Sequence, residues 1–196
     1  MTTGAVHATI MLVGDSNIAF ALSALAFEMT GEKGPSFVLV DAARAGTGIR
    51  HPTSDFWAAR LRELAARLDV DGYVVNLGIN DTTEKGSTTS RGYGNYGAKV
   101  DWLMGVLDER PVWWTNLPCD IVPPRRQSGC HAVNEALAAA QARWPNLCVL
   151  DWCAVAAGQG AYLVENRGGV HLSAHGSIAW AHLVGQAVKT YRFGGH

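Results

Sequence analysis

Short, unbroken apolar runs alternate along the chain with stretches in which apolar residues recur at helical spacing. Apolar runs of this kind are typical of strands buried on both faces of a parallel sheet. The predicted strands are 8–13, 37–41, 72–77, 111–116 and 147–151, and the predicted helices are 18–29, 54–68, 98–107, 130–143 and 174–191. This alternation predicts an α/β fold, a three-layer α/β/α sandwich with a central parallel sheet of about five strands. Because no repeat or linker divides the chain, we expect a single domain over residues 1–196.

Glycines and polar residues follow the first three predicted strands. Gly14-Asp15-Ser16 ends the first strand, Gly46 follows the second, and Asn80 follows the third. The carboxyl ends of parallel strands meet at one edge of the sheet, which is where ligands bind in such folds. The sequence therefore predicts that these residues converge at one rim.

Ser16 lies where a nucleophile is often placed, between a buried strand and the start of a helix. The unpaired N–H groups and the positive dipole end of a helix N-terminus favour negative charge on or near the serine oxygen. A simpler interpretation is that Gly, Asp and Ser form an ordinary turn and helix cap. Motifs elsewhere in the sequence are needed to distinguish a catalytic serine from an ordinary helix cap.

Charge and composition exclude several classes of function. The formal net charge is −1, and no run of like charges suggests a nucleic-acid partner or an anionic membrane surface. The N-terminal apolar run is short and lacks a basic flank, so we expect no membrane span and a cytoplasmic protein. Histidines, cysteines and carboxylates show no metal-ligand spacing, and no phosphate-binding or dinucleotide motif occurs. We expect no metal and no other cofactor, and nothing in the sequence specifies an oligomeric state.

The four cysteines do not form a dense disulfide framework. We expect them to be buried free thiols. Cys119 and Cys130 flank a proline-rich loop, however, and could bridge it in an oxidising compartment.

Aromatic residues give only a weak indication of a substrate pocket. Tyr93 and Tyr96 fall in a predicted loop over residues 82–97, where they could line a substrate pocket together with Trp57. The adjacent Trp113 and Trp114 point to opposite faces of a strand, so at least one belongs to the core.

The order of these signals resembles the SGNH, or GDSL, hydrolase family. The motifs are Gly14-Asp15-Ser16, a glycine at Gly46, Gly78-Ile79-Asn80-Asp81, and Val170-His171 before the last helix. The resemblance spans nearly the whole chain and implies a flavodoxin-like fold and hydrolysis of small-molecule esters. It assigns Ser16 as the nucleophile and His171 as the base. The oxyanion would be held by the N–H groups of Ser16 and Gly46 and by the Asn80 side chain, with Gly48 a rival to Gly46.

The chain departs from the family pattern at one position. The family has Asp three residues before the histidine, whereas this chain has Gly168. A main-chain carbonyl could orient His171 in a Ser-His dyad, or Glu165 could supply the carboxylate, or the protein no longer hydrolyses esters. We favour the dyad because the other positions match.

Two further functions stay open. One is a non-catalytic ligand-binding protein on the SGNH fold, motivated by Gly168. The other is a flavodoxin-like domain that binds a phosphate group at the first strand-to-helix turn. The leading hypothesis is a serine esterase in which Ser16, Gly46, Asn80 and His171 form the catalytic site. An acetylated carbohydrate or a lipid ester as substrate, and acyl transfer to an alcohol in place of water, stay open.

Overall fold

A computed structural model describes residues 7–30, 36–49, 53–82, 95–164 and 168–193. Five parallel strands form one sheet in the order β2-β1-β3-β4-β5. The strands are β1 (His7–Gly14), β2 (Ser36–Asp41), β3 (Gly72–Asn76), β4 (Val112–Thr115) and β5 (Leu147–Leu150). This order is that of the flavodoxin-like sandwich, so the predicted fold class is confirmed.

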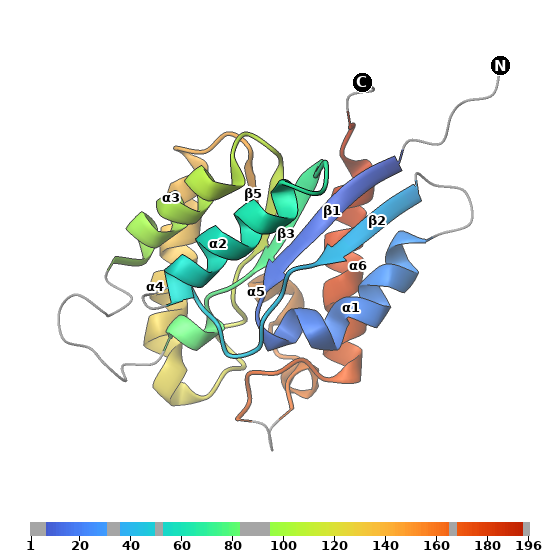
Figure 1. Ribbon diagram of the computed structural model, residues 1–196. Helices are drawn as coiled ribbons and strands as arrows, with labels where there is room; N and C mark the ends of the chain where they lie inside the picture. The colour runs from blue at the N-terminus through green and yellow to red at the C-terminus, as the bar shows by residue number, and fades with distance from the viewer. Residues whose placement is uncertain (1–6, 31–35, 50–52, 83–94, 165–167, 194–196) are drawn as a thin grey trace.

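Helices cover both faces of the sheet (Figure 1). On one face α1 (Ser16–Met29) packs against α6 (Ala174–Thr190). The other face carries α2 (Thr53–Ala65), α3 (Tyr96–Leu107) and α4 (Pro124–Gln141). Short helical turns complete the chain: η1 (Ile79–Asp81), α5 (Trp152–Ala156) and η3 (Gly160–Tyr162). None of the described helices is long and apolar enough to cross a membrane.

The topology places a switch point between the ends of β1 and β3. These strands are neighbours, yet the chain leaves β1 for a helix on one face and reaches, after β3, a helix on the other. Ligands bind at such switch points in open α/β sheets. Residues that follow β1 and β3 therefore flank the most favourable ligand position.

Several sequence expectations need correction. Helix α4 begins at Pro124, six residues before the expected start, because proline is well suited to the first turn of a helix, where its missing N–H costs nothing. Helix α2 ends at Ala65, so Leu68 lies outside it and is partly exposed. The short helix α5 was not expected at all.

The aromatic residues expected near a pocket belong to the core instead. Tyr96 is buried in α3, and its hydroxyl donates to the carbonyl of Leu77 at 3.3 Å. Trp57 is fully buried. Trp113 and Trp114 are both buried, on opposite faces of β4, so neither is free to recognise a substrate. Tyr93 lies outside the described residues.

Candidate active site

Ser16 is the first residue of α1, directly after the end of β1. Asp15 caps the helix, and its Oδ1 accepts the N–H of Asn17 at 2.9 Å. Gly14 is required by packing, because a Cβ there would collide with the side chain of Ile18 and the carbonyl of Asn76. The turn thus presents the half-buried Ser16 beside the first-turn N–H groups, which have no acceptor within the helix.

Asn80 joins three loops of the rim. It lies in η1, after β3, and its Nδ2 donates to Asp15 Oδ2 at 3.1 Å and to the carbonyl of Thr47 at 2.9 Å. These bonds connect the ends of β1, β2 and β3 through one side chain. The predicted convergence of the three segments at one rim is therefore observed.

Gly46 and Gly48, the two rival glycines, have different environments. Gly46 lies in an exposed turn with φ of +75°, which glycine adopts without strain, and a Cβ there would meet nothing within 4 Å. Gly48 is buried, its carbonyl accepts the indole N–H of Trp57 at 3.0 Å, and a Cβ there would overlap the Asp81 carboxylate. Gly48 therefore supports the loop, while Gly46 is the glycine that a ligand can approach.

Two buried carboxylates underlie the rim. Asp81 Oδ2 accepts the N–H of Ile49 at 3.0 Å and so anchors the loop after β2. Asp15 is fully buried, and desolvation raises its pKa from 3.8 to about 7, with a further rise from the nearby Asp81 and an opposing effect from the Asn17 N–H. Both carboxylates therefore support turns at the rim.

His171 is held against the start of α1 by Asn17. The Asn17 Nδ2 donates to the carbonyl of Val170 at 3.1 Å, and the N–H of Leu172 donates to Asn17 Oδ1 at 2.9 Å. The His171 ring also lies edge-on to Phe20 of α1, with 5.4 Å between the ring centroids. The segment that carries His171 therefore lies beside the helix turn that carries Ser16.

Sequence reasoning missed Asn17. It occupies the buried stripe of α1, four residues before Ala21 and eight before Leu25, and only 6% of its surface is exposed. A buried polar side chain needs hydrogen-bond partners, so the asparagine among the apolar positions of this helix could have indicated a contact with another part of the chain.

The residues before His171 supply no carboxylate among those described. Gly168 and Gly169 have φ values of +80° and +64°, in the left-handed region that favours glycine. Glu165, the alternative acid, lies outside the described residues.

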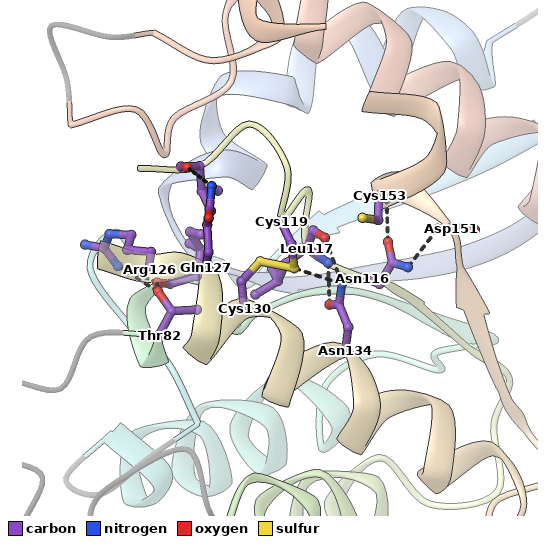
Figure 2. Close-up of a disulfide and its surroundings, with 12 residues drawn as sticks. Thr82, Asn116, Leu117, Cys119, Arg126, Gln127, Cys130, Asn134, Asp151 and Cys153 are labelled. Carbon is purple, nitrogen blue, oxygen red and sulfur yellow. Dashed lines mark hydrogen bonds between the residues drawn. A yellow bond between two sulfur atoms is a disulfide. The ribbon is translucent and has the colours of Figure 1, made fainter. Parts of the chain in front are cut away.

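The loop after β4 is cross-linked, which corrects the expectation of free thiols. Cys119 and Cys130 form a disulfide (Figure 2), with 5.5 Å between their Cα atoms. Cys148 and Cys153 are free. The cytoplasmic location stays a prediction, and the disulfide argues against it, because such bonds are rare in reducing compartments.

Arg126, near the disulfide, supports the turn of Asn80. Its Nη1 donates to the carbonyl of Ile79 at 2.7 Å and to Thr82 Oγ1 at 3.0 Å. Desolvation lowers the pKa of the guanidinium, and its buried Nε has no partner among the described residues.

A cavity of about 20 Å³, close to the volume one water needs, lies behind the rim. It is lined by side chains that include Asn17, Asn76 and Asn116. Across the described part of the chain, no group of three His, Cys, Asp or Glu side chains is arranged to hold a metal ion.

Residues 9–186 match a family model described as "Protein of unknown function (DUF459)". The chain belongs to the DUF459 family. No curated protein sequence matches this DUF459 member.

Several solved structures resemble this DUF459 member along nearly its whole length. The lipase/acylhydrolase from Enterococcus faecalis is 16% identical, with a TM-score of 0.77 over 93% of this chain and 95% of that one. The C-terminal catalytic domain of a Streptococcus pneumoniae peptidoglycan O-acetyltransferase is 15% identical, with a TM-score of 0.69 over 94% of each chain. A catalytic mutant of an acetylxylan esterase from Geobacillus stearothermophilus is 12% identical, with a TM-score of 0.69 over 98% and 99%. The expected resemblance to the SGNH hydrolases is confirmed at the level of the fold.

Proposed function

We propose that this chain is a serine hydrolase of the SGNH type, which cleaves a small-molecule carboxylic ester through an acyl-serine intermediate. One observation carries the proposal: Asn17, the residue after Ser16, hydrogen-bonds both neighbours of His171. This contact supports the pairing of Ser16 with His171, because it connects the segment that carries the histidine to the helix turn that carries the serine. Solved structures with this fold include an acylhydrolase and an acetylxylan esterase, which supports an acyl ester as the substrate class.

The reaction begins when Ser16 Oγ attacks the ester carbonyl carbon and His171 takes the hydroxyl proton. An imidazole has a pKa near neutrality, so it can accept that proton and return it to the departing alcohol. The C–O bond to the alcohol breaks and leaves the acyl group on Ser16. Water, deprotonated by His171, then releases the carboxylic acid and restores the serine.

The tetrahedral oxyanion is stabilised by N–H donors of the rim. We assign the main-chain N–H groups of Ser16 and Gly46 and the Asn80 side chain to this role. The Asn80 amide nitrogen carries two hydrogens, which it donates to Asp15 Oδ2 and the Thr47 carbonyl. As negative charge develops, the oxyanion therefore accepts a hydrogen bond from one of these two N–H groups, in place of the present acceptor or together with it.

Gly168 takes the position of the usual triad acid, so we assign Ser16 and His171 to a Ser-His dyad or an atypical triad. Loss of the orienting carboxylate from a serine protease triad lowers turnover by about 10⁴-fold and still leaves measurable catalysis. The hydrogen bonds that hold the main chain around His171 support activity without that carboxylate.

The proposal is tested by reaction with a fluorophosphonate probe, read by intact mass. We expect the wild type to gain one probe on Ser16, Ser16→Ala to lose labelling, and His171→Ala to label only at a slow residual rate that requires high probe concentration. Ser23→Ala, an exposed serine of the same helix, and His175→Ala, an exposed histidine of α6, are matched controls that keep full labelling. A folded wild type that stays unlabelled would contradict the proposal.

Two observations favour a second function, a ligand-binding protein without turnover on the same fold. Gly168 cannot supply the acid, and the Asn80 hydrogens are already engaged. This function predicts no labelling, together with a rise in melting temperature when a non-hydrolysable acyl compound such as an acetamide is added.

A further inference from the structure

Asn17 makes a two-sided connection to the segment of His171. Its side-chain amide donates to the carbonyl of the residue before the histidine and accepts the N–H of the residue after it, at 3.1 and 2.9 Å. The pattern is that of a β-bridge in which a side chain replaces one strand. Asn17 and Leu172 are 6% and 5% exposed, so water competes little for these bonds.

The connection is rigid on both sides. The backbone N–H of Asn17 is held by the Asp15 carboxylate at 2.9 Å, which fixes the first turn of α1. On the far side, the N–H of Val164 donates to the carbonyl of His171 at 2.9 Å. Asn17 thus fixes the segment of His171 relative to the turn of Ser16, with few rotatable bonds between them.

The chain turns sharply before His171. Gly168 and Gly169 have φ values of +80° and +64°, in the left-handed region that favours glycine. The N–H of Gly169 donates to the carbonyl of Val164 at 3.2 Å, and Leu163 and Leu172 form an isolated antiparallel bridge. Asn17 adds the connection between this turn and the helix that begins with Ser16.

We propose that Asn17 is a positioning residue that keeps His171 in register with Ser16 through the main chain on either side of the histidine. The role rests on the proposed function, because it concerns the transfer of the serine proton. It predicts that Asn17 affects the reaction through His171 and not through the serine turn itself.

The test measures the second-order rate constant of fluorophosphonate labelling between pH 5 and 9. We expect Asn17→Ala to lower it by about 10²-fold, as is typical when a catalytic group is misplaced by about 1 Å. Asn17→Asp keeps the acceptor for the Leu172 N–H but loses the donor to the Val170 carbonyl. Its labelling rate relative to the wild type should therefore fall less at low pH, where the aspartic acid is protonated and can donate.

Asn146→Ala is the matched control. Asn146 also holds the main chain across a long sequence separation, donating to the carbonyls of Asp108 and Arg110 at 2.9 and 2.8 Å. It precedes β5 and therefore lies at the opposite end of the sheet. Its replacement should leave the labelling rate unchanged.

A double-mutant cycle separates positioning from a structural effect. In a His171→Ala background, Asn17→Ala should cause no further loss, because the group on which it acts is gone. An equal loss in both backgrounds, or an unchanged rate in the single variant, would overturn the role of Asn17 while leaving the esterase proposal intact. A wild type without labelling would overturn the proposed function itself. Circular dichroism of each variant verifies that it is folded.

Discussion

At the scale of single residues, the rim depends on polar groups that are buried before any substrate arrives. Asp15 and Asp81 are 0% and 2% exposed, and each accepts a main-chain N–H of a rim turn. Burial of ionisable groups costs free energy unless hydrogen bonds offset it, and functional sites commonly accept that cost. The ionisation of Asp15 should therefore have a measurable effect on the free energy of unfolding.

The pKa of Asp15 makes stability depend on pH. Burial raises this pKa from 3.8 to about 7, so between these values the folded protein binds a proton that the unfolded chain does not. The contribution of Asp15 to the free energy of unfolding is present at low pH and is lost as pH rises toward and through 7. Over the whole window we expect a loss on the order of 4 kcal/mol.

Urea denaturation of the wild type and Asp15→Asn at several pH values between 4 and 8 tests this expectation. The variant cannot ionise at this position, so its stability relative to the wild type should improve steadily as pH rises. A constant difference between the two proteins across this range would rule out the raised pKa.

Asn80 supplies a second prediction at this scale. Replacing it with alanine removes one proposed oxyanion donor and the bridge between Asp15 and Thr47. We expect Asn80→Ala to lower the labelling rate by about 10²- to 10³-fold. Asn95→Ala, at an exposed asparagine whose side chain does not cap α3, should leave it unchanged. Equal rates for the two variants would contradict the role of Asn80.

The sequence could indicate these residues only in part. Ser16 and Asn80 follow buried strands, so the strand pattern alone places them at one rim. The role of Asn17 depends on partners 153 and 155 residues away, and no local pattern encodes such a contact. The family motif predicts the histidine, whereas the side chain that holds its segment emerges only from the fold.

At the scale of elements, the loop after β2 is constrained in two different ways. Gly46 is needed for its positive φ, whereas Gly48 is needed because the Asp81 side chain occupies the space of a Cβ. The Asp81 carboxylate is buried and bonded to Ile49, so it cannot move aside freely.

These constraints predict unequal effects of the same substitution. Gly46→Ala should cost about 1 kcal/mol of stability, from the backbone conformation alone. Gly48→Ala should cost more, about 2–3 kcal/mol, because overpacking displaces buried polar groups. Urea denaturation of both variants measures the difference, and the reverse order would contradict this account of the loop.

The disulfide constrains the loop between β4 and α4. It closes a short loop of sequence separation 11, and Asn134 pairs with both main-chain polar groups of Leu117 nearby (Figure 2). Replacing both Cys119 and Cys130 with serine should lower the free energy of unfolding by about 3 kcal/mol. Cys153→Ser, which removes a free thiol, is the control. Intact mass without reductant should show the wild type lighter than its reduced form by two hydrogen atoms.

Element boundaries show where local patterns fail. The strands are predicted closely, because unbroken apolar runs between turn residues leave little choice. The start of α4 was missed because residues 123–129 contain two prolines, two arginines and no apolar stripe, and tertiary contacts decide their conformation. Gly129 packs against the backbone of Thr82, and Arg126 bonds the turn of Ile79, contacts that local sequence does not show.

At the scale of the whole molecule, the two ends of the chain complete the site together. Helix α1 begins with Ser16, α6 follows His171, and the two helices pack against each other on one face of the sheet (Figure 1). Far from the rim, Glu28 of α1 joins them: it pairs with Lys189, accepts from Gln186 at 3.1 Å, and lies 3.3 Å from His182. The packing is close, because a Cβ at Gly185 would overlap Glu28.

This connection predicts a pH effect opposite in sign to that of Asp15. The hydrogen bond from Lys189 lowers the pKa of Glu28 from 4.5, with burial opposing it and the other partners of Glu28 contributing. The contribution of Glu28 to stability is therefore fully present above pH 4.5 and is lost as pH falls through the lowered pKa. Glu28→Gln should be less stable than the wild type at pH 7, and the difference should shrink below pH 4.5.

Urea denaturation at pH 7 and pH 3 measures this change, with Glu63→Gln as the control. Glu63 pairs with Arg60 at 3.5 Å on an exposed helix surface, where ion pairs contribute little. Because Glu28 lies at the opposite end of α1 from Ser16, its replacement should leave the labelling rate of a folded protein unchanged. A labelling rate that falls together with stability would instead mean that the spacing of α1 and α6 is transmitted along the helices to Ser16 and His171.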